Sequence, residues 1–379
     1  MYNYSDSQKK ISGRNMNCTD DTDLTREVVS KLREIRPRNT KLAYEGPQKE
    51  YIRYAESKYG CSIVTAERVL SYLVNHLTKR EKKNSKGKKV GKVIVGQHIK
   101  ALVDLYRFQS QVPVDNATTV PEYPRSDAVK KFLKMIERSE YEKEREEYVD
   151  RGIGTIVDGY SNEEYKKIAS YHLFQNTVPG LRNRLDHLLG DSMLLRGNHK
   201  RQMELADCFS IKLNESEGLT ECIALVAVSR NGKTNKNGRV EYSGCLRNVE
   251  VDMCAVGAFF MYMFARFACE EEFPNVFIPE EWYRVKVLKG KDKEHPISYH
   301  AQYEAIRICY DALGIKTKKK THANRGSGVR RADVAGTEES QLRRLGGWNS
   351  DALSTSYLTN LPMEALRAQA GFSPKSGKK

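Results

Sequence analysis

Near the end of the chain, residues 321–357 read THANRGSGVRRADVAGTEESQLRRLGGWNSDALSTSY. His322 and Arg325 are three residues apart, so on a helix they share one face. Trp348 follows His322 by 26 residues, and Tyr357 follows Trp348 by nine. Helical segments between these points can bring an imidazole, a guanidinium, an indole and a phenol into one pocket.

The stretch between Arg325 and Trp348 predicts two helices. Helix-forming residues fill 329–345, Gly336 indicates the end of the first helix, and Thr337 is placed to cap the second. A purely structural explanation of the aromatic residues competes with a functional one. The chain holds 21 tyrosines, and a tryptophan at the end of a helix usually belongs to a core.

Together, these side chains suit chemistry on a phosphodiester. A planar guanidinium matches the non-bridging oxygens of a phosphate, and a tyrosine can be a nucleophile that forms a covalent intermediate. In order and spacing, the motifs HANR, LGGW and STSY resemble the C-terminal signature of the tyrosine recombinases, with Ser354 in the usual Thr position. The resemblance implies that His322, Arg325 and Trp348 hold a DNA phosphate. It also implies that Tyr357 attacks this phosphate to form a 3′-phosphotyrosyl link.

A further arginine is expected earlier in the chain. In the tyrosine recombinases a first catalytic arginine precedes an aspartate by eleven residues, and Arg196 precedes Asp207 by that distance. The family usually has glycine before this arginine and an acidic residue three positions after it, where this chain has Leu195 and His199. Arg196 is therefore the favoured phosphate-binding arginine, and Arg201 is the alternative, otherwise expected to contact the DNA backbone.

A β-hairpin is predicted from two apolar runs at 221–229 and 239–243. They flank the polar, glycine-containing turn RNGKTNKNG at 230–238. In the resembled family, a hairpin lysine donates a proton to the leaving 5′ oxygen. The resemblance implies this role for Lys233, with Lys236 as the second candidate, although most hairpin lysines are simply exposed to solvent.

The composition limits the class of partner. The 379 residues predict two or three domains, and 64 Lys and Arg against 49 Asp and Glu give a net charge of +15. This excess favours a polyanion such as nucleic acid.

The eight cysteines show no CxxC or zinc-ligand spacing, so no metal site is expected, and scattered thiols suit a reducing compartment. No signal peptide and no apolar run of about 18 residues is present, so neither secretion by that route nor a membrane span is predicted.

The expected fold is mainly α-helical with a small β-sheet or hairpin. Residues 1–22 are polar and predicted to be disordered. Apolar residues recur at helical spacing over 23–150, which the resemblance assigns to a helical domain that clamps DNA, and residues 160–379 would form the recombinase-like catalytic domain. Ser161 and Glu164 form a capping box that begins the first helix of this second domain.

Several basic clusters are candidate DNA contacts. Residues 79–92 carry eight basic residues and one acidic one, and a solvated loop, a nuclear import signal and a loop that crosses DNA phosphates all remain open. The segments 36–41 and 316–320 are further candidates. The full set of expected DNA-binding residues is Arg36, Arg38, Lys41, Lys79, Arg80, Lys82, Lys83, Lys86, Lys88, Lys89, Arg201, Lys236, Lys318, Lys319 and Lys320.

Four motifs narrow the resemblance: GKTN at 232–235, CAVGAFFMYMFARF at 254–267, WNS at 348–350 and LPMEALRAQAGF at 361–372. They resemble the recombinases of Crypton-type eukaryotic transposons and the related fungal DNA-binding domains of centromere proteins. The resemblance implies a nuclear enzyme that acts on double-stranded DNA as a homo-oligomer and needs no cofactor. The tail 358–372 would form a helix that either exchanges between subunits or folds back. The alternatives are a catalytically inactive DNA-binding descendant and a type IB topoisomerase.

Overall fold

The computed structural model describes residues 24–358 and 366–371 apart from short gaps. Outside the description are residues 1–23, 25–26, 29, 33, 83–84, 112–121, 148–157, 214–221, 230–239, 270–271, 318, 359–365, 367–368 and 372–379. The predicted disordered tail and most of the predicted C-terminal helix therefore lie outside the described residues. The chain divides into two units, Met1–Val149 and Asp150–Lys379.

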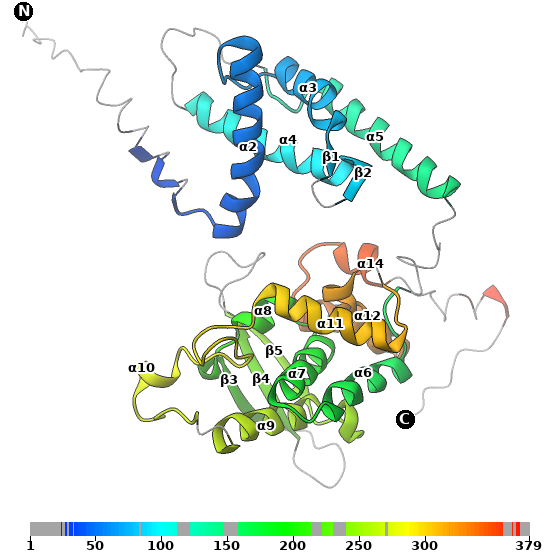
Figure 1. The fold of residues 1–379 in the computed structure, drawn as a ribbon. Helices are drawn as coiled ribbons and strands as arrows, with labels where there is room; N and C mark the ends of the chain where they lie inside the picture. Colours follow the sequence, from blue (N-terminus) through cyan, green and yellow to red (C-terminus); the bar gives the residue numbers. More distant parts are fainter. Residues whose placement is uncertain are drawn as a thin grey trace, which may run out of the picture. The chain divides into compact units, whose positions relative to one another are not determined.

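The first unit is a helical bundle (Figure 1). Its elements are α2 (Arg38–Tyr59), α3 (Ala66–Asn75), η1 (Leu77–Lys79), β1 (Glu81–Lys82), β2 (Ser85–Lys89), α4 (Lys92–Gln111) and α5 (Asp127–Glu146). Tyr51 of α2 and Tyr72 of α3 are fully buried, and their rings meet edge to face with centroids 5.4 Å apart. Leu102 of α4 and Val129 of α5 complete the contact between the four helices.

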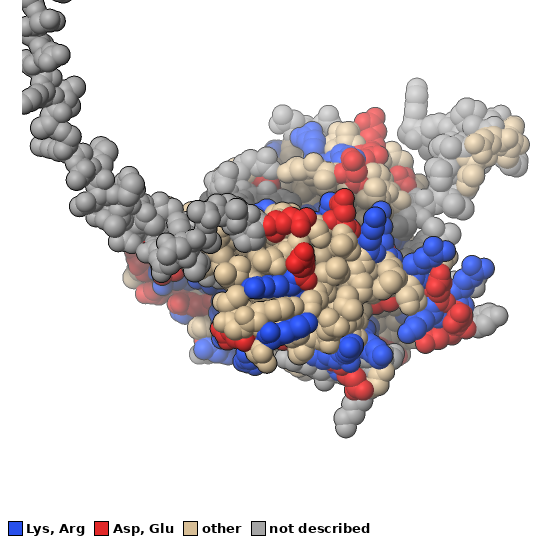
Figure 2. Space-filling view, turned by 90° about the horizontal axis from the view of Figure 1, so that it is seen from above, with Lys and Arg blue, Asp and Glu red and all other residues tan. Residues whose placement is uncertain are grey.

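The basic segment 79–92 contains a short β-hairpin, whereas its composition suggested a loop. β1 pairs antiparallel with β2, and Glu81 lies opposite Lys89. Gly87 within β2 has a φ of +80°, and its N–H donates a hydrogen bond to a carboxylate oxygen of Glu81 at 3.1 Å. Figure 2 shows basic and acidic side chains interspersed over the described part of the face that it displays.

The second unit is mainly helical with one three-stranded antiparallel sheet (Figure 1). Its helices are α6 (Asn162–Phe174), α7 (Val178–Ser192), α8 (Gly197–Gln202), α9 (Ala255–Phe264), α10 (Pro279–Trp282), α11 (Tyr299–Leu313), α12 (Ala323–Val334), α13 (Glu339–Gly346) and α14 (Ala352–Ser356). The short turns are η2 (Leu205–Asp207), η3 (Val251–Met253), the π-helix η4 (Ala265–Cys269) and η5 (Lys320–His322), and the strands are β3 (Cys208–Lys212), β4 (Ile223–Ser229) and β5 (Glu241–Leu246). The predicted Ser161–Glu164 capping box is present at the start of α6.

The sheet confirms the predicted hairpin and adds a strand. β4 pairs with β5, and Ser229 lies opposite Glu241, so the chain reverses between these residues. β3 pairs with the other edge of β4 and was not predicted. The inner face of the sheet places Leu225, Ala227 and Cys245 in the core of the unit.

Two glycines allow α12 to approach α7 closely. A Cβ atom at Gly328 would lie 2.6 Å from the carbonyl oxygen of Asp191, and one at Gly190 would lie 2.9 Å from Nδ2 of Asn324. At this crossing Asn324 donates a hydrogen bond to the carbonyl of His187 at 3.1 Å. The crossing therefore fixes the first turn of α12 against the end of α7.

The predicted break between α12 and α13 is present, but its cap is different. Gly336 has a φ of +91° and follows the end of α12. The predicted cap Thr337 instead uses its backbone N–H to close α12, with a hydrogen bond to the carbonyl of Ala332 at 3.0 Å. Glu338 is the residue that precedes the first turn of α13.

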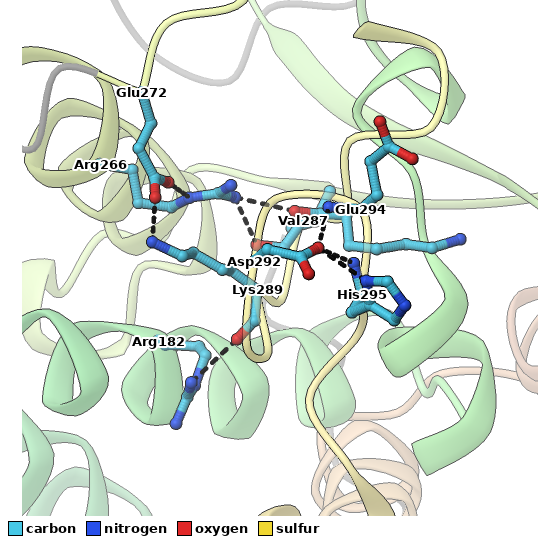
Figure 3. A network of polar contacts seen from close by, with 9 residues as sticks. Arg182, Arg266, Glu272, Val287, Lys289, Asp292, Glu294 and His295 are labelled. Carbon is cyan, nitrogen blue, oxygen red and sulfur yellow. Dashed lines mark hydrogen bonds and ion pairs between the residues drawn. The ribbon is translucent and has the colours of Figure 1, made fainter. Parts of the chain in front are cut away.

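A buried arginine braces the segment between α10 and α11 (Figure 3). Arg266 has no exposed surface, and its Nη1 donates hydrogen bonds to the carbonyls of Lys286 and Val287 at 2.8 and 3.2 Å. Its Nε donates to a carboxylate oxygen of Glu272 at 3.3 Å, and Glu272 also pairs with Lys289. A charge this deeply buried is tolerated because these acceptors replace water.

The braced segment supports the turn that follows α8. Arg182 of α7 donates a hydrogen bond to the carbonyl of Lys289 at 2.9 Å (Figure 3). The N–H of Val287 donates to the carbonyl of Met203 at 2.9 Å. The polar network of Arg266 is thus connected by hydrogen bonds to the residues directly after α8.

We predict that Arg266→Met lowers the free energy of unfolding by about 3 kcal/mol, because two buried carbonyls and Glu272 lose their donor. Urea-induced unfolding measures the change. Arg307→Met is the matched control, since the exposed guanidinium of Arg307 pairs with Glu304 and Asp311 on the surface of α11. Surface pairs contribute little, so this control should change stability far less, and equal losses for the two variants would contradict the prediction.

Candidate active site

Arg325 lies at the centre of the predicted site. It belongs to the first turn of α12 and is only 2% exposed. Its Nη1 donates a hydrogen bond to the carbonyl of Leu194, and its Nη2 donates to the carbonyl of Gly346 at 2.6 Å. The guanidinium carbon lies 3.5 Å from the ring centroid of Trp348. Two carbonyls and one aromatic face therefore hold the cation in a single orientation.

Leu194 adopts an unusual backbone conformation to accept this hydrogen bond. It lies between α7 and α8 with a φ of +51°, in the left-handed region. Such a conformation costs a non-glycine residue about 1–2 kcal/mol. The side chain is buried with Val329 and Leu342, and this packing maintains the backbone position that offers the carbonyl to Arg325.

The LGGW motif forms a sharp reversal at the end of α13. Gly347 has a φ of +61°, and the N–H of Trp348 donates to the carbonyl of Arg343 at 3.0 Å. The reversal lays the indole against Gly346, where a Cβ atom would lie 1.6 Å from Cζ3 of Trp348. Gly346 therefore has two roles, since it accommodates the indole and offers its carbonyl to Arg325.

Tyr357 is the residue at which α14 ends. Its N–H donates to the carbonyl of Leu353 at 3.0 Å, and the fully buried Leu353 anchors the helix. The ring centroid of Tyr357 lies 5.0 Å from that of Trp348 in an edge-on arrangement, and 5.5 Å from the guanidinium carbon of Arg325. The structure thus brings Arg325, Trp348 and Tyr357 into one group.

A cavity with a volume of about 460 Å³ opens on the Arg325 side of this group. We call it the arginine cavity, because Arg196, Arg325, Arg343 and Arg344 line it. Glu241 of β5 is the acidic residue on its wall. Guanidinium groups gathered in a concave surface are suited to bind an oxyanion.

A second hollow, the tyrosine cavity, has a volume of about 490 Å³. It is lined by His322, Tyr357, Lys319 and Arg330. Arg330 is held in place by a hydrogen bond from Nη2 to the carbonyl of Asp158 at 2.6 Å. The predicted site residues are therefore distributed over two hollows that the Arg325–Trp348–Tyr357 group connects.

The cations of the site influence the titration of its members. Burial, followed by the charge of Arg196, lowers the pKa of Arg325 to about 9, so the guanidinium stays protonated at neutral pH. Burial is also the main cause that lowers the pKa of His322, with Arg325 and Arg196 as the next causes. The imidazole of His322 is therefore neutral at neutral pH and able to accept a proton.

Arg196 and Arg201 have different surroundings. Arg196 precedes α8 and lines the arginine cavity with Arg325. Arg201 instead donates hydrogen bonds to Gln302 of α11 and, at 3.3 Å, to Asn198. The structure thus brings Arg196, and not Arg201, into the arginine cavity.

The remaining predicted DNA contacts are scattered over described and undescribed parts of the chain. Arg36 pairs with Asp104, and Arg80 lies 3.4 Å from Glu50, so part of their charge is neutralised internally. Lys320 lies 3.6 Å from Asp311. Arg38, Lys41, Lys79, Lys89 and Lys319 are exposed, and Lys82 is half-buried. Outside the description are Lys233, Lys236 and Lys318, together with Lys83 and the side chains of Lys86 and Lys88.

Two residues next to Arg196 were missed as site residues. Lys200 is 2% exposed, forms an ion pair with Asp186 at 3.0 Å and thereby fastens α8 to α7. His199 lines the arginine cavity. Their place within four residues of Arg196, the favoured phosphate-binding arginine, was the signal that could have identified them.

Within the described part of the chain, no three His, Cys, Asp or Glu side chains are grouped so that they could hold a metal ion. None of the described helices is both long and apolar enough to cross a membrane.

We predict that Gly346→Ala displaces the indole of Trp348, because the added methyl group would overlap the ring. Stability should fall by about 1–3 kcal/mol, the usual effect of overpacking, and the near-ultraviolet circular dichroism of the indole should change. Gly257→Ala in α9 is the control, because its Cβ would meet Cys254 at an ordinary 3.5 Å. An unaltered tryptophan signal in Gly346→Ala would count against the packing described above.

The comparisons with known proteins agree on the fold. A family model described as centromere DNA-binding protein complex CBF3 subunit, domain 2, matches residues 122–377. No curated protein matches the chain. The XerH site-specific recombinase, bound to palindromic difH substrate in a post-cleavage complex, aligns with a TM-score of 0.57 and 13% identity, over 92% of this chain and 84% of that chain.

A second solved structure gives the same result. The Tn1549 transposon integrase, in complex with transposon right end DNA, aligns with a TM-score of 0.52 and 13% identity, over 92% of this chain and 98% of that chain. The predicted fold, mainly helical with a small sheet and a tyrosine-recombinase-like catalytic domain, is confirmed. Because the family match spans more than half of its residues, the chain belongs to the family of the centromere DNA-binding protein complex CBF3 subunit, domain 2.

Proposed function

We propose that the protein cleaves and rejoins DNA strands at specific sites through a 3′-phosphotyrosyl intermediate. The observation that carries the proposal is the group formed by Arg325, Trp348 and Tyr357, in which a fixed buried cation lies 5.5 Å from the ring of a tyrosine. Arg196 adds a second guanidinium to the same cavity. This arrangement provides a nucleophile next to a site for the phosphate that it attacks.

In the proposed reaction, Arg196 and Arg325 bind the non-bridging oxygens of one phosphate and stabilise the charge that develops there. The hydroxyl oxygen of Tyr357 bonds to phosphorus as the bond from phosphorus to the 5′ oxygen breaks. His322, neutral at neutral pH, accepts the tyrosine proton. Lys233 donates a proton to the leaving oxygen, a role that rests on the family resemblance alone because Lys233 lies outside the described residues.

Rejoining is the reverse of cleavage. The 5′ hydroxyl of a second strand attacks the phosphotyrosyl ester, and Tyr357 leaves with its proton restored. One phosphodiester-type bond is exchanged for another in each step, so the reaction needs no external source of energy. Recombination, in which the second strand comes from another duplex, and relaxation by a type IB topoisomerase differ only in which strand attacks.

A second candidate function is DNA binding without catalysis. The family match favours it, because the matching family is described by binding to centromere DNA. The two candidates share the basic surface and the phosphate site. They differ in whether the hydroxyl of Tyr357 reacts.

The biological setting that we propose is transposition of the Crypton type. It is supported by the four motifs that resemble Crypton recombinases, among them GKTN at 232–235 and LPMEALRAQAGF at 361–372. This setting places the protein in the nucleus, and strand exchange between two duplexes needs more than one copy of the chain. Exchange of the tail at 358–372 between subunits remains part of this proposal.

Tyr357→Phe is expected to abolish a covalent protein–DNA adduct on a nicked suicide substrate, because it removes only the attacking oxygen. Affinity for the same duplex should stay within a few-fold, since phosphate contacts supply most of it. Denaturing gel electrophoresis detects the adduct. Tight binding by the wild-type protein without any adduct would favour the non-catalytic candidate.

Arg196→Ala is expected to slow cleavage by about 10²–10³-fold, the usual effect of removing one preorganised charge-stabilising donor. Arg201→Ala is the matched control five residues further along the chain, because Gln302 and Asn198 hold its guanidinium away from the cavity. Single-turnover cleavage rates compare the two variants. A larger loss in Arg201→Ala than in Arg196→Ala would reverse the assignment.

A further inference from the structure

His199 lies between two hollows of the second unit. It is the third residue of α8, and Arg196 directly precedes that helix. His199 lines the arginine cavity and also a polar hollow of about 320 Å³ that contains Glu204 and Asp207. We call this third space the acidic hollow. The imidazole therefore separates a cationic cavity from an acidic one.

Charged groups face His199 from every element packed around it. Neither ring nitrogen has a hydrogen-bond partner among the described residues. The charged lining residues of the two hollows are Arg196 before α8, Arg325 of α12, Arg343 and Arg344 of α13, Glu241 of β5, Glu204 and Asp207 beside η2, and Lys286. Such a half-buried imidazole without a partner is available to a ligand that enters the arginine cavity.

We propose that His199 is a further phosphate-binding residue, neutral in the free protein and protonated when a DNA phosphate occupies the arginine cavity. The proposal rests on the phosphate site proposed above, but it does not require that the phosphate be cleaved. Protonated His199 would be a third cation beside Arg196 and Arg325, and it would form only when a phosphate is present to balance its charge.

The electrostatics of the cavity support this behaviour. Burial lowers the pKa of His199, Arg196 and Arg325 lower it further, and Glu241 opposes them. A phosphate between the two guanidiniums offsets their repulsion and contributes a negative charge of its own, so it raises the pKa of the imidazole. A group whose pKa rises on binding takes up a proton, and the affinity therefore increases as the pH falls through the interval between the two pKa values.

The experiment measures protons taken up on DNA binding. We use isothermal titration calorimetry to measure the binding of a DNA duplex of mixed sequence to the full chain. The titrations are performed near pH 6.5, the ordinary pKa of histidine, in buffers of different ionisation enthalpy. The dependence of the binding enthalpy on the buffer gives the proton count. We expect net uptake by the wild-type protein and, in His199→Gln, a decrease of up to about one proton per bound site.

Two variants separate His199 from its neighbours. His322→Gln removes the other titratable imidazole of the site and should retain the share of the uptake that belongs to His199. His199→Lys supplies a permanent cation, so it should bind DNA without that share of the uptake and with a weaker dependence on pH. If His199→Gln lowers the stability of the fold, His199→Lys still tests the role of the imidazole, because the two replacements disturb the fold differently.

The outcomes distinguish this proposal from the proposed function. If the uptake in both His199→Gln and His199→Lys equals that of the wild-type protein, His199 is not protonated by the phosphate and the proposal is overturned, even where the covalent adduct forms. If the uptake is lost in both variants while the wild-type protein forms no adduct, the proposal stands and strand cleavage fails.

Discussion

The site depends on one constraint, the burial of a cation that must remain charged. The guanidinium of Arg325 is held by the carbonyls of Leu194 and Gly346 and by the face of Trp348. Each of these partners requires a feature elsewhere: a left-handed residue after α7, a glycine pair at the end of α13, and the close crossing of α7 and α12. Because the cation is already oriented in the free protein, the phosphate binding proposed above would need little reorganisation.

Strand cleavage and DNA binding without catalysis, the two functions proposed above, place different demands on the second unit. A protein that only binds DNA needs cations on its surface, and exposed lysines such as Lys319 meet that need. Burial of a guanidinium is not by itself a sign of chemistry, because Arg266 is fully buried and braces the fold, but Arg325 also lines a cavity and stacks on the indole of Trp348. The place of Arg325 on the wall of this cavity, with Tyr357 beside it, is the feature on which the proposed cleavage rests.

Much of the fold and part of the site could be predicted from the sequence, for local reasons. The capping box at Ser161 and the end of α12 at Gly336 depend on residues within a few positions of each other. The grouping of Trp348 and Tyr357 follows from the single short helix, α14, between them. The position of Leu194 could not be predicted, because its backbone is determined by packing against α12 and α13. The hairpin at 79–92 could not be predicted either, because lysine has a low propensity for strands.

The position of Arg196 beside Arg325 also affects which of the two residues is more easily replaced during evolution. Two like charges share a cavity whose acidic wall residue is Glu241, and their repulsion lowers the stability of the protein whenever DNA is absent. Most proteins tolerate only small losses of stability. The two arginines differ in this respect, because loss of Arg325 would leave the carbonyls of Leu194 and Gly346 without their donor, whereas loss of Arg196 would relieve the repulsion. In a lineage that lost its need for the phosphate site, Arg196 would therefore be replaced before Arg325.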